Sequence, residues 1–167
     1  MKKSTKFIIA LLVTVGALAI TYRVVNQAPS KDLAADAQMQ EIITSGGCLQ
    51  CHSGSPDLPF YANWPVASGM VQKDITQGYR AFDMTEMAEA LKAGKPVGKV
   101  ALAKVEKVIM DGTMPKHAYY MVHWGSSVTD AKKEMAMAWV KQHRLAHYAN
   151  GLAGDTSHRR FYSCGYA

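Results

Sequence analysis

Two cysteines followed directly by a histidine, in "CLQCH" at residues 48–52, constrain the fold of this chain more than any other feature. Haem c is held by thioether bonds from two cysteine sulfurs to the haem vinyl groups, and two intervening residues let the sulfurs reach both vinyls. The adjacent histidine then binds the iron from one side. The sequence therefore predicts one covalent haem c, attached through Cys48 and Cys51, with His52 as proximal iron ligand.

Two other kinds of site also use closely spaced cysteines, and both fit this chain less well. A thioredoxin-like pair is expected near a βαβ pattern and at a helix N-terminus, and the sequence indicates neither. A structural zinc site needs four ligands, usually at short range, whereas the only other cysteine is Cys164. For Cys164 we weigh an intermolecular disulfide against a place in a disordered tail, and favour the tail.

The second axial position of the iron decides between electron transfer and chemistry at an open site. Met114 lies in a predicted loop, and Pro115 stiffens the backbone just after it. Most other methionines have the spacing of helical core residues. We expect Met114 to be the distal ligand, with His123 and His117 of the same loop as alternatives and an open site as the remaining one.

Further residues are candidates for the surroundings of the haem. Arg80 and Lys116 are candidates to pair with the propionates, although surface charge explains each as well. His143 and His147 lie four residues apart on a predicted helix; because no third ligand is evident, we expect them on a solvated face. Aromatic residues in two loops are candidate pocket walls, with core packing as the alternative: Phe60, Tyr61, Trp64, Tyr119, Tyr120 and Trp124.

The N-terminus reads as a targeting segment. Lysines precede sixteen uncharged, mostly apolar residues at 7–22, so the segment is either a signal anchor or a signal peptide cleaved near residues 17–19. We favour the anchor because the apolar character continues through Val24 and Val25. Lysines before the segment stay in the cytoplasm. This predicts a single anchor in the inner membrane, with the haem domain in the periplasm.

The net charge of +6 does not indicate a nucleic-acid partner. Four of the basic residues flank the apolar segment, and 15 basic and 13 acidic residues follow residue 30. Such a mixture is typical of a solvated surface rather than a basic footprint. We expect redox proteins or quinol-linked donors as partners, and no nucleic acid.

Hydrophobic periodicity predicts an all-α fold, a cytochrome c-like bundle of four to five short helices around the haem. The expected helices cover 33–45, 66–79, 83–94, 98–112 and 129–151, and the segments between them, above all 53–65 and 113–127, are expected to be loops. Met135, Trp139 and Leu145 should point inward from the last helix, which Gly151 should end. The domains are an anchor or signal peptide at 1–25, a linker at 26–36, a monohaem cytochrome c domain at 37–150 and a tail at 151–167.

Several stretches together resemble the haem-binding domain family, which occurs alone and at the N-terminus of tri-haem bacterial cytochrome c peroxidases. They span roughly residues 46–150 in the family's order: "GCLQCHSGSPDLPFY", "DITQGYRAFDM", "GKPVG", "GTMPKHAYYMVHWGSSVTDAKKEMAMAWV" and "HRLAHYAN". The likeness is closest to the peroxidase N-terminal domain. It implies His52 and Met114 as axial ligands, and electron transfer from the quinol side of the membrane towards a dihaem peroxidase centre.

The chain departs from those peroxidases in one important respect. They carry two further CxxCH sites, where peroxide is reduced, and this sequence has one. Peroxidase activity is therefore not carried over. We expect an electron carrier without substrate chemistry of its own. The alternatives are a shortened peroxidase or small haem peroxidase with an open iron site and, ranked last, a gas sensor. Lys116 also stands where the family commonly has a second proline.

Overall fold

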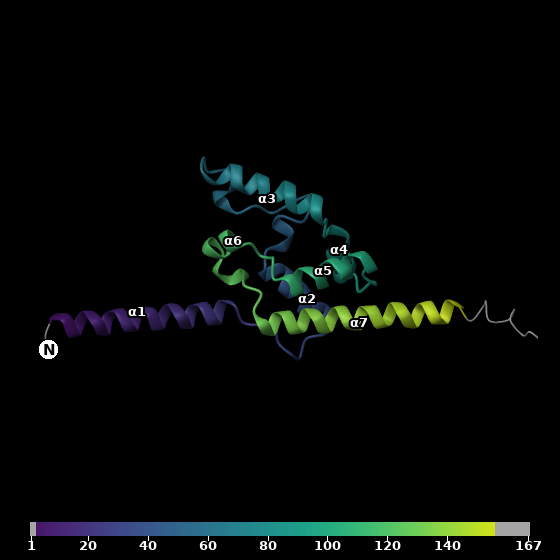
Figure 1. Cartoon of the computed structure of the whole chain (residues 1–167), viewed down its shortest axis with the longest axis horizontal. Coiled ribbons are helices and arrows are strands. Elements are labelled where there is room, and N and C mark those ends of the chain that lie inside the picture. The colour runs from purple at the N-terminus through teal and green to yellow at the C-terminus, as the bar shows by residue number, and fades with distance from the viewer. Residues whose placement is uncertain (1–2, 156–167) are drawn as a thin grey trace, which may run out of the picture.

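The computed structural model describes residues 3–155. Residues 156–167, which include Cys164 and most of the predicted tail, lie outside them. All the regular secondary structure in residues 3–155 is helical, with no strand, so the predicted all-α class is confirmed (Figure 1). The elements are α1 (Lys3–Val25), α2 (Ala35–Ser45), η1 (Cys48–Gln50), η2 (Phe60–Asn63), α3 (Ala67–Ala81), α4 (Thr85–Lys92), α5 (Lys99–Asp111), α6 (His117–Val122), η3 (Trp124–Ser126) and α7 (Asp130–Asp155).

The hydrophobic core lies where α2 and α5 pack against α7, with α4 on the other side of α2. Glycines with positive φ follow α4 and α5 at Gly94 and Gly112, as the sequence predicts for helix ends. Asp83 accepts a hydrogen bond from the backbone N–H of Thr85 (2.9 Å), the first residue of α4. The core residues are Met39, Ile42, Ile43, Met84, Met87, Leu91, Val97, Leu102, Val105, Ala136, Trp139 and Val140.

Polar contacts fasten the first core helix to the last. Asp36 of α2 accepts hydrogen bonds from Trp139 Nε1 and from His143 Nε2, both at 2.7 Å, on α7. His147 Nε2 lies 2.7 Å from the carbonyl oxygen of Val97. The prediction that His143 and His147 form a solvated face is therefore wrong. Both imidazoles contact groups of distant segments, Asp36 and the carbonyl oxygen of Val97, and the hydrophobic periodicity of one helix does not show such contacts. We call Asp36, Trp139 and His143 the α2–α7 clasp.

Three details of the predicted helices also differ from the structure. Leu145, expected inward, is 58% exposed, whereas its neighbour Arg144 pairs with Glu106 of α5 and His147 contacts Val97. The helix passes Gly151 and ends at Asp155, since one glycine inside a helix costs only about 1 kcal/mol. The loops expected at 53–65 and 113–127 contain the short helices η2, α6 and η3.

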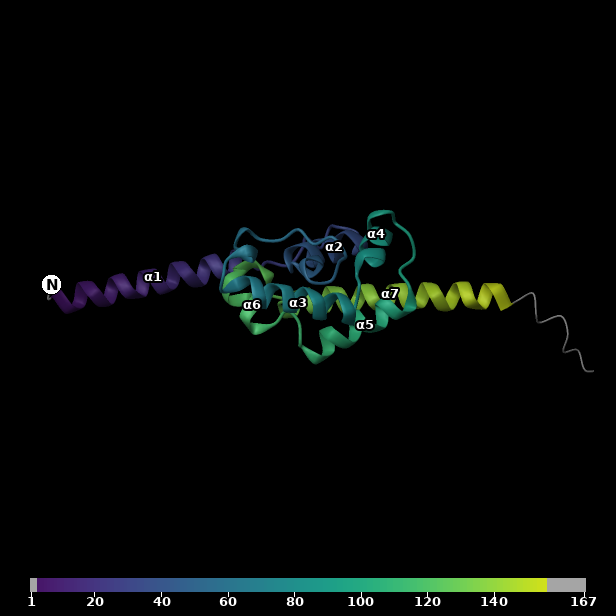
Figure 2. The same ribbon diagram turned by 90° about the horizontal axis from the view of Figure 1, so that it is seen from above.

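Helix α1 extends away from the other helices of the domain (Figures 1 and 2). Residues Ser4–Val25 of α1 have a mean hydropathy of 2.2 and no buried residue, and within residues 3–155 this is the helix long and apolar enough to cross a membrane. A membrane anchor and a signal sequence both have this character.

The end of α1 is attached to the domain by Asn26. This side chain is 3% exposed. Its Nδ2 donates to the carbonyl oxygens of Trp124 (2.5 Å) and Tyr22 (2.9 Å), and its Oδ1 accepts from the backbone N–H of Ser127 (2.9 Å). The Tyr22 and Ser127 hydroxyls are 2.6 Å apart. The connection that the sequence predicts as a polar linker is therefore fixed at its start, and we call these contacts the Asn26 clasp.

Candidate haem site

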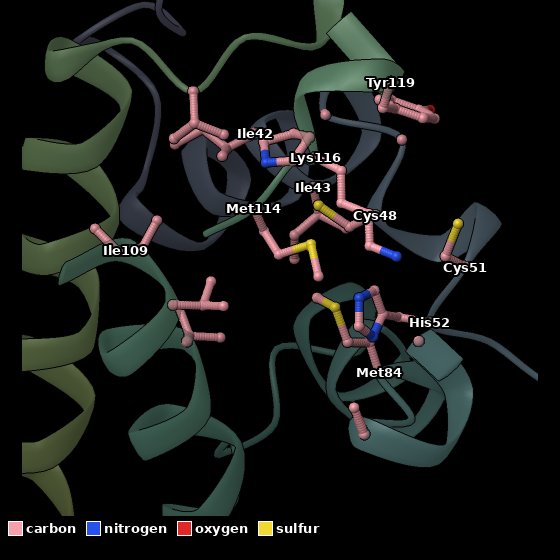
Figure 3. Close-up of a pocket in the computed structure, with 18 of the residues that line it drawn as sticks. Ile42, Ile43, Cys48, Cys51, His52, Met84, Ile109, Met114, Lys116 and Tyr119 are labelled. Atoms are coloured by element: carbon pink, nitrogen blue, oxygen red, sulfur yellow. The ribbon is translucent and has the colours of Figure 1, made fainter. Parts of the chain in front are cut away.

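An apolar cavity of about 270 Å³ opens between α2, the "CLQCH" segment, α3 and the end of α5. Cys48, Cys51, His52 and Met114 all line it, although Met114 follows His52 by 62 positions in the sequence. Figure 3 shows the side chains of these residues around one space. The part of the wall that α2 and α5 contribute is apolar: Met39, Ile42, Ile43, Val105, Val108 and Ile109.

The turn between α3 and α4 orients the predicted proximal ligand. His52 Nδ1 lies 2.8 Å from the carbonyl oxygen of Phe82, and the carbonyl oxygen of His52 accepts from the backbone N–H of Met84 (2.7 Å). Since a carbonyl oxygen only accepts, Nδ1 carries the proton and Nε2 is left with its lone pair. This is how metal-binding histidines are usually held, with the second nitrogen donating to the protein.

Two methionines reach the cavity, of which sequence reasoning singled out one. In Figure 3 the sulfurs of Met114 and Met84 both point towards its centre, Met84 beside the imidazole of His52. Met84 was among the methionines read as core, and it is indeed 6% exposed and part of the core cluster. Its place at the cavity could not be seen in the sequence, because Met84 stands at the start of a predicted helix with the pattern of any core methionine.

The two alternative distal ligands lie elsewhere. His117 is exposed at the start of α6, beside the ring of Tyr120. His123 Nε2 lies 2.9 Å from the hydroxyl of Tyr61, and its ring stacks on Tyr119 at 3.9 Å between centroids. Burial lowers the pKa of His123, against the opposing effect of a backbone hydrogen bond to Tyr119. Neither histidine lines the cavity.

The electrostatics of the two cysteines argue against a redox-active pair. Burial raises the pKa of the Cys48 thiol to about 11, and burial together with the charge of Asp74 also raises the pKa of Cys51. A disulfide oxidoreductase needs the opposite shift. Residues 3–155 contain no group of three or more His, Cys, Asp or Glu side chains placed to hold a metal ion, so no zinc site is seen there. Two thiols, an imidazole and a thioether in an apolar cavity fit haem c.

Two glycines let other residues approach the cysteine segment closely, and sequence reasoning predicted neither approach. A Cβ on Gly78 of α3 would lie 2.5 Å from the carbonyl oxygen of Cys51, and one on Gly47 (φ +65°) would lie 2.0 Å from the Tyr119 hydroxyl. That hydroxyl donates to Gln50 Oε1 at 2.7 Å. A glycine inside a predicted helix is the signal that could have found Gly78, because it often marks a close approach.

The predicted propionate partners and aromatic walls are only partly at the cavity. Lys116 lines it, and its Nζ lies 2.6 Å from Asp74 Oδ1; Arg80 does not line it. Tyr119 is the one member of the aromatic set in the wall. The expectation for the others is not met: Phe60 and Trp64, for example, are 82% and 57% exposed.

Comparison with known proteins supports the interpretation of the cavity. A profile described as "Haem-binding domain" matches residues 7–142. The chain is also 36% identical over 104 residues to cytochrome c peroxidase Ccp of Escherichia coli strain K12. That alignment covers 62% of this chain and 22% of the peroxidase, so it spans about a fifth of the relative. No solved structure matches the chain significantly.

Proposed function

The chain belongs to the haem-binding domain family, and from this premise we propose that it is a membrane-anchored monohaem c-type cytochrome that transfers single electrons outside the cytoplasm. Cys48 and Cys51 hold one haem c through thioethers in this proposal. His52 and Met114 bind its iron. When bound, the haem supplies a one-electron iron couple, whose potential methionine ligation raises.

The observation that carries the proposal is the meeting of these four side chains in one apolar cavity. The protein's own part is to hold and orient. The carbonyl oxygen of Phe82 fixes the tautomer and direction of His52, and the aliphatic wall from α2 and α5 excludes water. A proton on Nδ1 and a free Nε2 suit permanent ligation rather than acid–base work.

The partners follow from the anchor and from the relative. If α1 remains uncleaved, the domain stands on the outer face of the inner membrane, because Lys2, Lys3 and Lys6 precede the apolar run at residues 7–22 and stay inside. We propose the quinol pool of that membrane as the electron source and a peroxidase or another terminal acceptor as the destination. The resemblance to a cytochrome c peroxidase supports the second half of this route.

The test is the absorption spectrum of the purified full chain in both oxidation states. We expect a low-spin ferric spectrum with the near-infrared charge-transfer band of methionine sulfur bound to ferric iron. Met114→Leu should abolish that band. The matched control is Met84→Leu, which removes the other thioether in the cavity and should leave the band in place. Loss of the band in the control alone would make Met84 the ligand.

A second candidate function is tested by the same spectra. This function is the reduction of hydrogen peroxide at an iron site without a distal ligand, and the relationship to a peroxidase favours it. It predicts a high-spin ferric spectrum that changes when peroxide is added, and Met114→Leu would then leave the spectrum unchanged. That outcome would replace the electron carrier by an enzyme.

A further inference from the structure

Large apolar side chains gather on one exposed face of the domain, although they come from separate segments. Phe60 and Trp64 of η2 are 82% and 57% exposed, and Val66 before α3 is 89% exposed. Val122 of α6 is 62% exposed and lines the same groove as these three. The neighbouring Met121 is 79% exposed. We call these five residues the apolar face.

The apolar face lies at the end of the domain from which α1 departs. In Figures 1 and 2, α6 and the first turn of α3 lie level with the last turn of α1, whereas α4 and the end of α7 lie at the opposite end. The Asn26 clasp makes this relation fixed, because it joins the end of α1 to η3, which follows α6 directly. A bilayer crossed by α1 along its length would thus meet this face of the domain.

We propose that the apolar face rests in the headgroup and outer acyl region of the bilayer that α1 spans. Its composition fits a lipid surface: aromatic side chains concentrate at membrane interfaces, and a contiguous exposed apolar patch usually marks a contact. Asp74, the acidic residue beside the groove, is paired with Lys116 and so presents little free negative charge. The proposal rests on α1 being retained as an anchor, as in the proposed function.

The anchor also makes so small a contact sufficient. Five apolar side chains would bind a free domain to lipid only weakly, because interfacial binding scales with the apolar area buried. Because the domain is already attached to the membrane through α1, its contact with the lipid is effectively intramolecular. This contact loses no further translational freedom. The contact then adds orientation rather than affinity. It holds the side of the domain that carries Tyr61, Tyr119 and the haem cavity next to the lipid.

The three tryptophans of the chain provide the test. Trp64 lies on the apolar face, Trp124 is fastened to the end of α1 through its carbonyl oxygen, and Trp139 is 1% exposed in the core. The full haem-loaded chain is placed in vesicles of ordinary lipid and of lipid brominated on the acyl chains, since bromine quenches tryptophan on contact. Haem quenching is the same in both vesicles and cancels in the ratio. Comparing the wild-type protein with Trp64→Phe and with Trp124→Phe shows how much of the bromine-dependent loss of emission comes from each tryptophan.

We expect a bromine-dependent loss of emission from both Trp64 and Trp124. An unchanged loss in Trp64→Phe would mean that Trp124 alone is quenched, which overturns the docked face and leaves the anchor standing. No bromine-dependent loss in any protein would mean that neither tryptophan reaches the lipid, which overturns the docked face. Whether the chain still sediments with the vesicles then tells whether α1 remains in the bilayer.

A second pair of variants tests the contact itself. Val66→Asp places a charge on the apolar face and should remove the Trp64 quenching while that of Trp124 persists. Val100→Asp is the matched control, because Val100 is also an exposed valine (71%) but lies in the first turn of α5, away from α1. It should leave both signals unchanged. The haem spectrum of each variant reports that the domain is folded, and equal Trp64 quenching in the two variants would contradict the proposal.

Discussion

At the scale of single residues, the two glycines inside α3 have opposite surroundings. A Cβ on Gly78 would lie 2.5 Å from the carbonyl oxygen of Cys51, whereas one on Gly69 would meet no atom within 4 Å. Both glycines cost helix stability relative to alanine. Gly69 has no compensating contact, while Gly78 permits α3 to cover the cysteine segment.

Gly78→Ala is therefore expected to destabilise the protein by about 1–3 kcal/mol, the usual cost of overpacking, and to lower the ratio of haem to protein. Gly69→Ala is the control and should raise the free energy of unfolding by about 0.5–1 kcal/mol. Denaturant unfolding and the haem absorbance per chain measure both quantities. Equal effects of the two substitutions would contradict the close approach.

His123 should make stability depend on pH. Burial holds its pKa below the ordinary value in the folded protein, so the unfolded chain binds the additional proton first. Stability is then full above about pH 6.5 and falls as the pH drops from there towards the lower folded value. His123→Gln cannot titrate and should flatten this part of the profile. Urea midpoints measured at intervals of pH check it, and parallel curves for the two proteins would contradict it.

Sequence reasoning at this scale succeeds where the chemistry is local. Cys48, Cys51 and His52 are recognised by their spacing alone, and Met114 by its place in a loop before a proline; the structure brings all four to one cavity. The carbonyl oxygen of Phe82 on His52 could not be predicted, since any residue has such an oxygen and only the tertiary fold selects one.

At the scale of elements, the α2–α7 clasp joins segments about a hundred residues apart. Trp139 Nε1 is buried, and Asp36 is its hydrogen-bond acceptor. Asp36→Ala should leave this donor unpaired and lower the free energy of unfolding by about 1–3 kcal/mol. Asp130→Ala removes an exposed aspartate paired only with Lys133 and should cost no more than about 1 kcal/mol. Thermal unfolding of the two variants makes the comparison, and similar melting temperatures would refute the clasp.

The positions of the helices could largely be predicted from the sequence, but which face of each helix is buried could not. Glycines and periodic apolar residues locate α2, α4 and α5 to within a few positions, because these helices pack on one core. Val66 and Met70, for example, have the spacing of one helical face, and the structure leaves them 89% and 62% exposed. Periodicity reports that a face is apolar and does not report what covers it.

At the scale of the whole molecule, the Asn26 clasp determines how the domain stands on α1. Asn26→Ala removes both side-chain bonds to the segment around η3 and should broaden the distribution of haem orientations in the membrane. Electron paramagnetic resonance of oriented multilayers measures that distribution. Gln27→Ala changes the exposed neighbour and should keep the wild-type distribution. A distribution equally narrow in both variants would show that the clasp does not set the orientation.

The fixed attachment of α1 has a consequence for kinetics. A domain on a slack tether samples a volume above the bilayer, and its encounters with a lipid-soluble donor depend on how often it returns to the surface. A domain held by Asn26 stays at one height. The lipid-soluble donor that we propose would then meet it by lateral diffusion in two dimensions. The rate of haem reduction is therefore expected to follow the mole fraction of donor in the lipid rather than its amount per volume of solution.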